Sequence, residues 1–233
     1  SPPVTAGATS TLGAGGGGVS GRSNKLASGS KPFFGVDIRQ SSVGHAVYPD
    51  AQAVALPGCG QSGSQGHRRP TMPAPLLLLI RHGQTAWNIQ RKVLGRTDIP
   101  LDEIGLAQAD TLPARIGPLD ALWCSPLGRA KQTAAPLAMA TGLGVRHDDA
   151  LMEMDQGELE GLGEAELLAR HGDLVRAWRE APEGLRLPGG ETMEEVADRA
   201  FAAFGRIAGQ HPNGRIAIVT HQIVLSVTVC RLH

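Results

Sequence analysis

The sequence has only three cysteines in 233 residues, Cys59, Cys124 and Cys230, and no Cys-x-x-Cys pair. Their odd number and wide spacing argue against a disulfide framework and a cysteine-rich metal site. Cys124 and Cys230 lie in apolar runs, so we expect both to be reduced core residues. This usage indicates a reducing compartment, and we expect the protein to be cytoplasmic. The alternative for Cys124 is a nucleophilic thiol, because it directly precedes a group of polar residues.

Long apolar runs and a surplus of positive charge are also missing. No apolar run approaches the roughly 18 residues that a membrane span needs, so we expect no membrane segment. The chain has 22 Lys and Arg against 22 Asp and Glu. Residues 72–233 carry 16 of the basic and 20 of the acidic residues, a net charge of −4. That charge argues against non-specific nucleic-acid binding, although a few arginines in one pocket can still bind an anion.

The first 71 residues lack any sustained hydrophobic period. They contain 14 Gly and 10 Ser, and the first methionine of the sequence is Met72. We expect residues 1–71 to be a disordered or non-native Gly/Ser-rich leader, and residues 72–233 to form the folded domain. A genuine targeting segment is the alternative, but residues 1–71 hold no apolar core of the kind that such signals use.

The remaining sequence alternates between apolar strands and amphipathic helices. Residues 76–80 are five consecutive large aliphatic residues, which is typical of a strand buried on both faces. Shorter runs predict strands at about 119–124, 145–147 and 216–219. Helices are expected at about 101–116, 126–140, 164–171, 174–179, 191–208 and 223–230. This order predicts an α/β fold, a three-layer α/β/α sandwich with a mostly parallel sheet.

Two of these helices need a specific argument. Ser125 and Pro126 predict a helix start, because serine caps free backbone N–H groups and proline is favoured in the first turn. Arg129 then lies about one turn in and can reach past a helix N-terminus that itself attracts anions. The β-branched composition of residues 223–230 favours a strand. The α/β alternation favours a helix there, which is our prediction.

Three of the predicted strands end beside residues that carry chemistry. One run ends at Arg81 and His82, another ends at His221, and the third is followed by Arg129. The carboxyl ends of parallel strands meet at one edge of the sheet, where α/β proteins bind their ligands. A histidine there can act as a nucleophile, and an arginine can hold an anion such as phosphate.

Other readings of the same residues remain open. His82 and His221 could be metal ligands, but the spacing of further His or Cys residues that a metal site needs is absent, so we predict no metal. A single buried histidine usually has a structural role and donates to a backbone carbonyl. Two histidines, each directly after a buried strand, make a purely structural role less attractive as an explanation. Glu153, taken alone, is more typical of a solvated charge than of a proton donor.

The polar segments resemble, in order, those of the histidine phosphatase superfamily, in its phosphoglycerate mutase-like branch. The resemblance rests on residues 81–88, 125–134, 153–161, 188–191 and 220–221. Five ordered motifs over about residues 75–232 make it specific, and it implies the phosphoglycerate mutase-like α/β fold. One departure is Leu159, which replaces a tryptophan often found there. The family also continues beyond the last motif, so we expect this domain to be truncated at its C-terminus.

The resemblance implies a role for each site residue. His82 would attack phosphorus and become a phosphohistidine, which requires a neutral ring whose other nitrogen donates to a carbonyl. Glu153 would protonate the leaving oxygen and then activate water. The phosphoryl oxygens would be held by Arg81, Arg129, His221, Asn88, Gln84 and Thr85. The implied substrate is a small phosphorylated molecule, with no metal and no resident cofactor.

The resemblance leaves three functions to weigh. Mutases of this branch usually carry Glu-Ser where this chain has Gln84-Thr85, and an adjacent arginine pair in the insertion. The insertion at residues 161–188 instead holds separated arginines, so we expect a metal-independent phosphatase acting on a small phosphomonoester. The alternative is a phosphoglycerate mutase that depends on 2,3-bisphosphoglycerate. A non-catalytic phosphate-binding protein is the second alternative, and a homodimer is one option for the oligomeric state.

Overall fold

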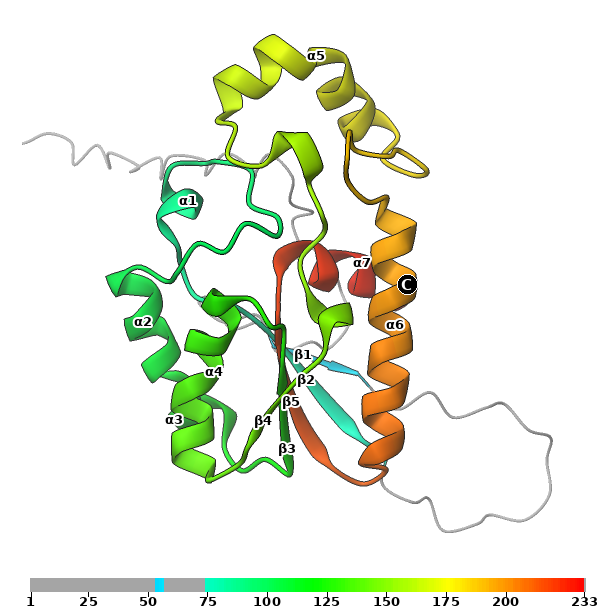
Figure 1. The fold of residues 1–233 in the computed structure, drawn as a ribbon. Helices are drawn as coiled ribbons and strands as arrows, with labels where there is room; N and C mark the ends of the chain where they lie inside the picture. The colour runs from blue at the N-terminus through cyan, green and yellow to red at the C-terminus, as the bar shows by residue number, and fades with distance from the viewer. Residues whose placement is uncertain (1–52, 57–73, 233) are drawn as a thin grey trace, which may run out of the picture. The chain divides into compact units, whose positions relative to one another are not determined.

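A computed structural model describes residues 53–56 and 74–232 (Figure 1). Within them, five strands form one sheet in the order β1-β2-β5-β3-β4. Their bounds are β1 Ala53–Leu56, β2 Leu76–Arg81, β3 Ala121–Cys124, β4 Val145–His147 and β5 Arg215–Thr220. The strands β2, β5, β3 and β4 pair in parallel, and β1 pairs with β2 antiparallel. The predicted mostly parallel sheet is therefore confirmed.

Strand β1 lies inside residues 1–71, which we expected to be a disordered or non-native leader. Its backbone pairs with β2, with Ala53 opposite Ile80. A run of only four aliphatic residues carries too little periodic signal to predict a strand. The other residues of the expected leader lie outside the described residues, so the leader stays a prediction.

The helices follow the predicted alternation. Their bounds are α1 Ala86–Ile89, α2 Glu103–Asp110, α3 Leu112–Ile116, α4 Gly128–Thr141, α5 Glu164–Glu180, α6 Met193–Gln210 and α7 Gln222–Leu232. Residues 222–232 thus form a helix, as the α/β pattern predicted. The helix expected over residues 101–116 is instead two helices that meet at Thr111. Pro113 explains the break, since its ring has no N–H to continue the helical ladder.

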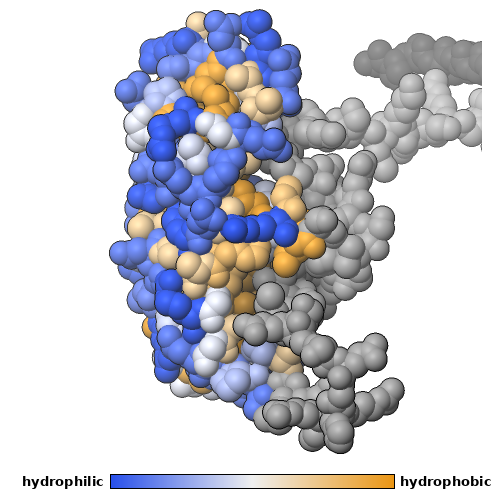
Figure 2. Space-filling view, turned by 90° about the vertical axis from the view of Figure 1, so that its right-hand side faces the viewer, coloured by the Kyte–Doolittle hydropathy of each residue, from blue (hydrophilic) through white to orange (hydrophobic). Residues whose placement is uncertain are grey.

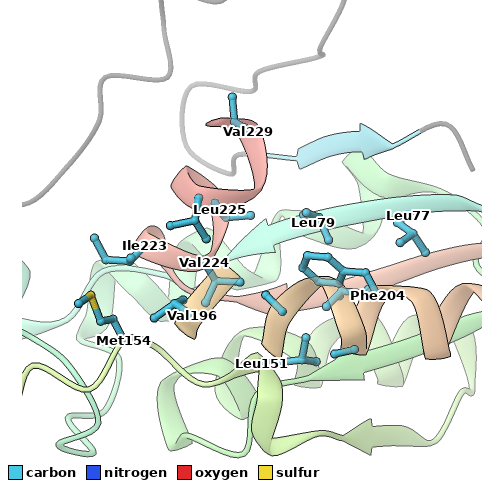
Figure 3. Close-up of a cluster of buried hydrophobic side chains, with 14 of the residues drawn as sticks. Leu77, Leu79, Leu151, Met154, Val196, Phe204, Ile223, Val224, Leu225 and Val229 are labelled. Atoms are coloured by element: carbon cyan, nitrogen blue, oxygen red, sulfur yellow. The ribbon is translucent and has the colours of Figure 1, made fainter. Parts of the chain in front are cut away.

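Alternate residues of each central strand face two different cores. Leu77 and Leu79 of β2 pack in one core with α6 and α7, and Phe204 of α6 lies beside them (Figure 3). Leu78 and Ile80 pack in the other core with α3 and α4. Figure 1 shows these helices on opposite sides of the sheet. The three-layer α/β/α arrangement is confirmed, and burial on both faces explains the unbroken apolar run of β2.

Several boundaries differ from the predictions for local reasons. The loop after β2 contains the short helix α1, because Thr85 and Asn88 form a capping box. The predicted pair of helices at 164–171 and 174–179 is α5, with a kink at His171. The last long helix begins two residues later than predicted, because Thr192 caps it together with Glu195. Cys230 is exposed on α7, so its expected place in the core was wrong.

The side of the molecule that carries α6 is mostly hydrophilic, and apolar residues show there in a band across the middle and in a patch near the top (Figure 2). The apolar stripe of α6 is buried at Val196, Ala200, Phe204 and Ile207. The polar face of the same helix supplies exposed residues such as Glu194 and Arg206. Among the described residues, no helix combines the length and the apolar character that crossing a membrane requires.

Candidate active site

The sheet register brings the predicted strand-end residues together. Arg81 lies opposite Thr220 at the ends of β2 and β5. The backbone N–H of His82 donates to the carbonyl of Thr220 at 3.0 Å, and that of Ser125 donates to the carbonyl of Val219 at 2.9 Å. The rings of His82 and His221 lie 5.1 Å apart, centroid to centroid. The carboxyl ends of three parallel strands thus form one polar site, as predicted.

His82 is oriented by a hydrogen bond to its own strand end. Its Nδ1 lies 2.7 Å from the carbonyl oxygen of Gly83. When Nδ1 donates to that oxygen, Nε2 has no proton and presents its lone pair. The turn itself is fixed by Thr133, which accepts the N–H of Gly83 at 3.0 Å and donates to the carbonyl of Arg129 at 2.7 Å. His82 is therefore held in the form that a nucleophile requires.

The charges of two arginines, Arg81 and Arg129, act on His82. Arg129 is fully buried and donates to the carbonyls of Thr97 at 3.0 Å and Gly95 at 2.6 Å. Among the described residues, the Nε atoms of Arg81 and Arg129 have no hydrogen-bond partner. Burial, together with the charges of Arg81 and Arg129, holds the pKa of His82 well below its usual value. Buried cations of this kind need an anion, which the site is arranged to accept.

Glu153 is buried, so the expectation of a solvated charge was wrong. Its carboxylate accepts the N–H of Met154 at 2.9 Å and the N–H of Ile223, in the first turn of α7, at 3.2 Å. Burial raises the pKa of Glu153, and these N–H groups and the two site arginines only partly oppose that shift. The carboxyl group can therefore keep a proton at higher pH than an exposed glutamate and deliver it to a leaving group.

His221 and Ser125 form a second buried pair in the site. The Nε2 of His221 lies 2.7 Å from the Oγ of Ser125. The Nδ1 of His221 is buried and has no partner among the described residues. Burial, followed by the charge of Arg129, holds the pKa of His221 well below its usual value, so the ring is neutral near pH 7.

The prediction that Ser125 and Pro126 start a helix was wrong by two residues. Helix α4 begins at Gly128 with Leu127 at its N-cap, and Leu127 makes no side-chain capping bond. The N–H of Gly128 instead donates to the carboxylate of Asp98 at 2.7 Å. An acidic side chain therefore already occupies this helix N-terminus, which was expected to attract the phosphate.

Three further predicted phosphate ligands make local contacts. The side chain of Gln84 donates to Asp102 at 3.2 Å. Thr85 is buried, and both its N–H and its hydroxyl donate to the Oδ1 of Asn88 at 3.0 Å. These contacts explain Gln84 and Thr85 as parts of the loop, and they leave Nδ2 as the atom with which Asn88 would donate to a phosphate. Direct phosphate contacts of all three residues stay predictions.

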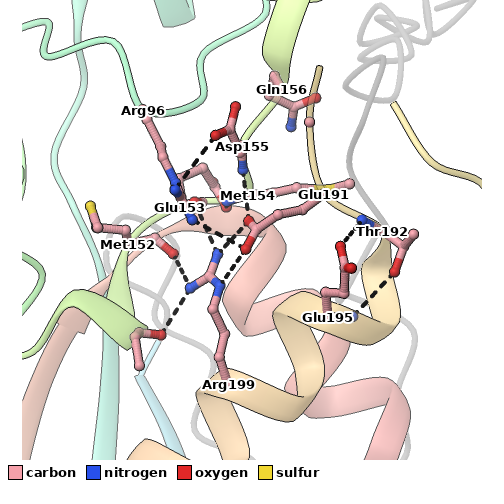
Figure 4. A network of polar contacts seen from close by, with 12 residues as sticks. Arg96, Met152, Glu153, Met154, Asp155, Gln156, Glu191, Thr192, Glu195 and Arg199 are labelled. Atoms are coloured by element: carbon pink, nitrogen blue, oxygen red, sulfur yellow. Dashed lines mark hydrogen bonds and ion pairs between the residues drawn. The ribbon is translucent and has the colours of Figure 1, made fainter. Parts of the chain in front are cut away.

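A network of polar contacts holds the loop that carries Glu153 (Figure 4). Arg199 of α6 donates to the backbone carbonyls of Ala150 at 2.9 Å, Met152 at 2.7 Å and Glu153 at 3.0 Å. It also binds the carboxylate of Glu191 through two hydrogen bonds of 2.9 Å. The guanidinium therefore fixes the backbone on both sides of the proton donor.

The segment 188–191 packs directly against the loop that follows Glu153. The N–H of Glu158 donates to the carbonyl of Pro188 at 2.9 Å, and the N–H of Glu191 donates to the carbonyl of Asp155 at 3.0 Å. Gly157 has a φ of 54°, and a Cβ added there would lie 2.1 Å from the oxygen of Pro188. Only glycine permits this approach, so the segment supports the proton-donor loop besides leading into α6.

Sequence reasoning missed Arg199, Thr133 and the contact of Ser125 with His221. A usable signal existed for Arg199, because it falls three residues after Val196, on the buried stripe of an amphipathic helix. A charged residue in that position needs polar partners. Thr133 stands inside one of the matched motifs, but the N–H that it accepts belongs to Gly83, 50 residues away in sequence. No local pattern predicts such a partner.

Neither a metal site nor a reactive thiol is found in this region. No three His, Cys, Asp or Glu residues within the described ranges are grouped so that they could hold a metal ion. Burial raises the pKa of Cys124 to about 12, so its thiol stays protonated and is no nucleophile. Cys124 and Cys230 are both free, as expected.

Comparison with known proteins agrees with this geometry. A family model described as "Histidine phosphatase superfamily (branch 1)" matches residues 77–233. The chain is 35% identical over 153 residues to a Salmonella paratyphi C protein named "Probable phosphoglycerate mutase GpmB", covering 65% of this chain and 71% of that protein.

Two solved structures are similar to the fold described above. An alpha-ribazole phosphatase from Shigella flexneri is 31% identical, with a TM-score of 0.61, over 67% of this chain and 78% of that chain. A mycobacterial glucosyl-3-phosphoglycerate phosphatase, solved as a complex with VO3, is 30% identical, with a TM-score of 0.61, over 67% of this chain and 80% of that chain.

Proposed function

Because the chain belongs to the histidine phosphatase superfamily, we propose that it hydrolyses a small phosphomonoester through a phosphohistidine on His82, without a metal. The observation that carries this proposal is the setting of His82. Its Nδ1 is engaged by Gly83, and the partly buried Arg81 and the fully buried Arg129 have buried Nε atoms without a hydrogen-bond partner among the described residues. A nucleophile with a bare nitrogen, set among cations with unused N–H donors, fits phosphoryl transfer.

In the first half-reaction, the lone pair on Nε2 of His82 attacks phosphorus. An Nε2–P bond forms, the bond from phosphorus to the leaving oxygen breaks, and the carboxyl group of Glu153 gives its proton to that oxygen. Arg81 and Arg129 stabilise the negative charge that gathers on the non-bridging oxygens. The raised pKa of Glu153 suits this role, because the group must be protonated when the substrate arrives.

In the second half-reaction, water attacks the phosphohistidine. The Glu153 carboxylate takes one proton from the water as its oxygen bonds to phosphorus, and the Nε2–P bond breaks. Inorganic phosphate leaves, His82 recovers its lone pair, and Glu153 is again protonated. Arg199 and Glu191 hold the loop so that one carboxyl group can serve both steps.

The insertion supports a phosphatase more than a mutase. In α5, Arg170 pairs with Glu166 at 2.8 Å and Arg176 pairs with Asp173 at 2.5 Å, and both exposed ion pairs lie within this one helix. These arginines therefore do not form an adjacent pair that could bind the carboxylate of a phosphoglycerate. A phosphoglycerate mutase activity is the second candidate, favoured by the similarity to the GpmB relative.

The test measures phosphate release by the full chain from a panel of phosphomonoesters in EDTA, with His82→Ala as control. The panel includes sugar phosphates, phosphoglycerates and p-nitrophenyl phosphate, and 3-phosphoglycerate is also tested for isomerisation with and without 2,3-bisphosphoglycerate. We expect release that the His82→Ala variant loses. Isomerisation that requires the bisphosphate would identify a mutase instead. Absence of both activities in a folded protein would contradict an enzymatic role and favour phosphate binding alone.

A further inference from the structure

We infer that Ser125 is a positioning residue that fixes the tautomer of His221, so that the Nδ1–H of His221 donates to the transferring phosphoryl group. This inference rests on the proposed function, because it assigns a role within the same site. Ser125 lies at the end of β3 and His221 at the end of β5, two strands that pair in parallel. The sheet itself therefore holds the two side chains together.

The hydrogen bonds of Ser125 decide which way its hydroxyl points. Its Oγ accepts the N–H of Leu127 at 3.3 Å and lies 2.7 Å from the Nε2 of His221. A serine hydroxyl has one proton to donate, and a backbone N–H can only donate to it. Among the described residues, the Nε2 of His221 is the only other hydrogen-bond partner of Oγ, so the hydroxyl proton has an acceptor only if Nε2 carries a lone pair. The hydroxyl therefore donates to Nε2, which must carry a lone pair.

A neutral ring with a bare Nε2 has its proton on Nδ1. The ring of His221 is fully buried, and the nearby charges of Arg129, Arg199 and Arg81 disfavour a second proton on it. His82, the other titratable group that faces it, is itself held neutral by burial and by the site arginines. The two tautomers of the neutral ring are thus the only states to consider, and Ser125 selects one of them.

The Nδ1–H that results is buried and has no hydrogen-bond partner among the described residues. The same is true of the Nε atoms of Arg81 and Arg129, and the charges of these two arginines act on the pKa of both His82 and His221. The ring of His221 lies 5.1 Å from that of His82, next to the phosphorus that His82 would attack. A phosphoryl oxygen would accept from Nδ1–H, whereas the opposite tautomer would turn a lone pair toward that oxygen.

A purely structural role for Ser125 is disfavoured by its surroundings. Helix α4 has Leu127 as its N-cap, and Asp98 satisfies the N–H of Gly128, so the hydroxyl of Ser125 is not the cap of that helix. Its short contact is with His221 instead. Loss of the hydroxyl should therefore change the tautomer of His221 more than the stability of helix α4.

The test is long-range ¹H–¹⁵N NMR of the full chain with ¹⁵N-labelled histidine, recorded near pH 7.5 with and without inorganic phosphate. A His221→Asn variant identifies the signals of His221. We expect the Nδ1–H tautomer in the unmodified protein, its loss or mixing in Ser125→Ala, and its retention in Ser125→Thr. Inorganic phosphate should bind Ser125→Ala about tenfold or more weakly, and kcat should fall by about 10- to 100-fold.

Ser226→Ala is the matched control. Ser226 is also buried, but its hydroxyl donates to the carbonyl of Gln222 within α7 at 3.0 Å. We expect this variant to leave the tautomer of His221 and the affinity for phosphate unchanged. The comparison separates the loss of one buried hydroxyl from the loss of the contact with His221.

An Nε2–H or doubly protonated His221 in the unmodified protein would overturn the inference. An unchanged tautomer and an unchanged phosphate affinity in Ser125→Ala would overturn it as well. The tautomer of His221 in the unmodified protein is itself predicted. The spectrum of that protein therefore tests the inference even if the Ser125→Ala variant does not fold. The spectra need no turnover. If no phosphomonoester is hydrolysed but the tautomer follows Ser125, the proposed function fails and the assignment of Ser125 stands.

Discussion

The guanidinium of Arg199 and the carboxylate of Glu191 are joined by two hydrogen bonds of 2.9 Å each. Both side chains are more than four-fifths buried, with exposures of 18% and 17%. Arg199 also donates to the carbonyl of Glu153, the residue that we assign as proton donor. One ion pair therefore links helix α6 to the loop on which catalysis would depend.

Replacing Arg199 should cost both stability and activity. In Arg199→Ala, three carbonyl groups lose a donor and the carboxylate of Glu191 loses two of its hydrogen bonds, so we expect the free energy of unfolding to fall by about 2–4 kcal/mol. Urea denaturation followed by circular dichroism measures this loss. Arg206→Ala is the control on the same helix, because Arg206 forms an exposed ion pair with Asp148. That variant should lose less than about 1 kcal/mol. Equal losses in the two variants would contradict the role of Arg199.

The pH dependence of kcat/KM should report Glu153 on its alkaline side. His82 must be neutral, and its pKa lies well below the usual 6.5, so the acidic limb lies below pH 6.5. Glu153 must be protonated, and burial raises its pKa above the usual 4.5. Activity should therefore fall as pH rises through the raised pKa of Glu153, after correction for ionisation of the substrate.

The Glu153→Gln variant tests this assignment. The variant should lose the alkaline limb of the pH profile, and its rate with an alkyl phosphate should fall by about 10²- to 10⁴-fold. The loss should be smaller with p-nitrophenyl phosphate, whose leaving oxygen needs little help from an acid. An alkaline limb that persists in Glu153→Gln would assign that limb to another group.

Gly157 should not tolerate a side chain. It has a φ of 54°, and an added Cβ would lie 2.1 Å from the oxygen of Pro188, so Gly157→Ala would push two backbone segments apart. We expect a loss of stability of more than about 2 kcal/mol and a large fall in kcat. Gly184 is the control, because its φ is 68° and nothing lies within 4 Å of an added Cβ. Gly184→Ala should lose only the stability that a left-handed backbone costs a residue with a Cβ, and its kcat should be unchanged. Similar losses in the two variants would contradict a clash between the Cβ added at position 157 and the oxygen of Pro188.

The parts of the fold that the sequence predicted are those with a strong local pattern. The five aliphatic residues before Arg81 mark a strand buried on both faces, and the structure places them in two cores. The position of His82 and His221 at strand ends follows from that pattern, since parallel strands end at one edge. The helix at residues 222–232 was predicted from the α/β alternation against its own β-branched composition.

The parts that the sequence did not predict depend on partners far away in the chain. The local sequence around Ser125 is typical of a helix cap, but its hydroxyl is hydrogen-bonded to His221, 96 residues later. Glu153 matches a solvated loop charge, but the start of α7 and the cores around it bury its carboxylate. In the sequence, Arg199 looks like any other helical arginine, because the loop that it binds lies far away in the chain. Tertiary contacts, rather than local propensity, set these environments.

The most direct test of the account is to trap the intermediate on His82. The full chain is mixed with a ³²P-labelled phosphomonoester that it hydrolyses, quenched in alkali within one turnover, and mapped by proteolysis. The account predicts protein-bound phosphate that is stable to alkali, lost in acid, located on the peptide that contains His82, and absent from His82→Ala. Turnover without any protein-bound phosphate, or label that persists in His82→Ala, would contradict it.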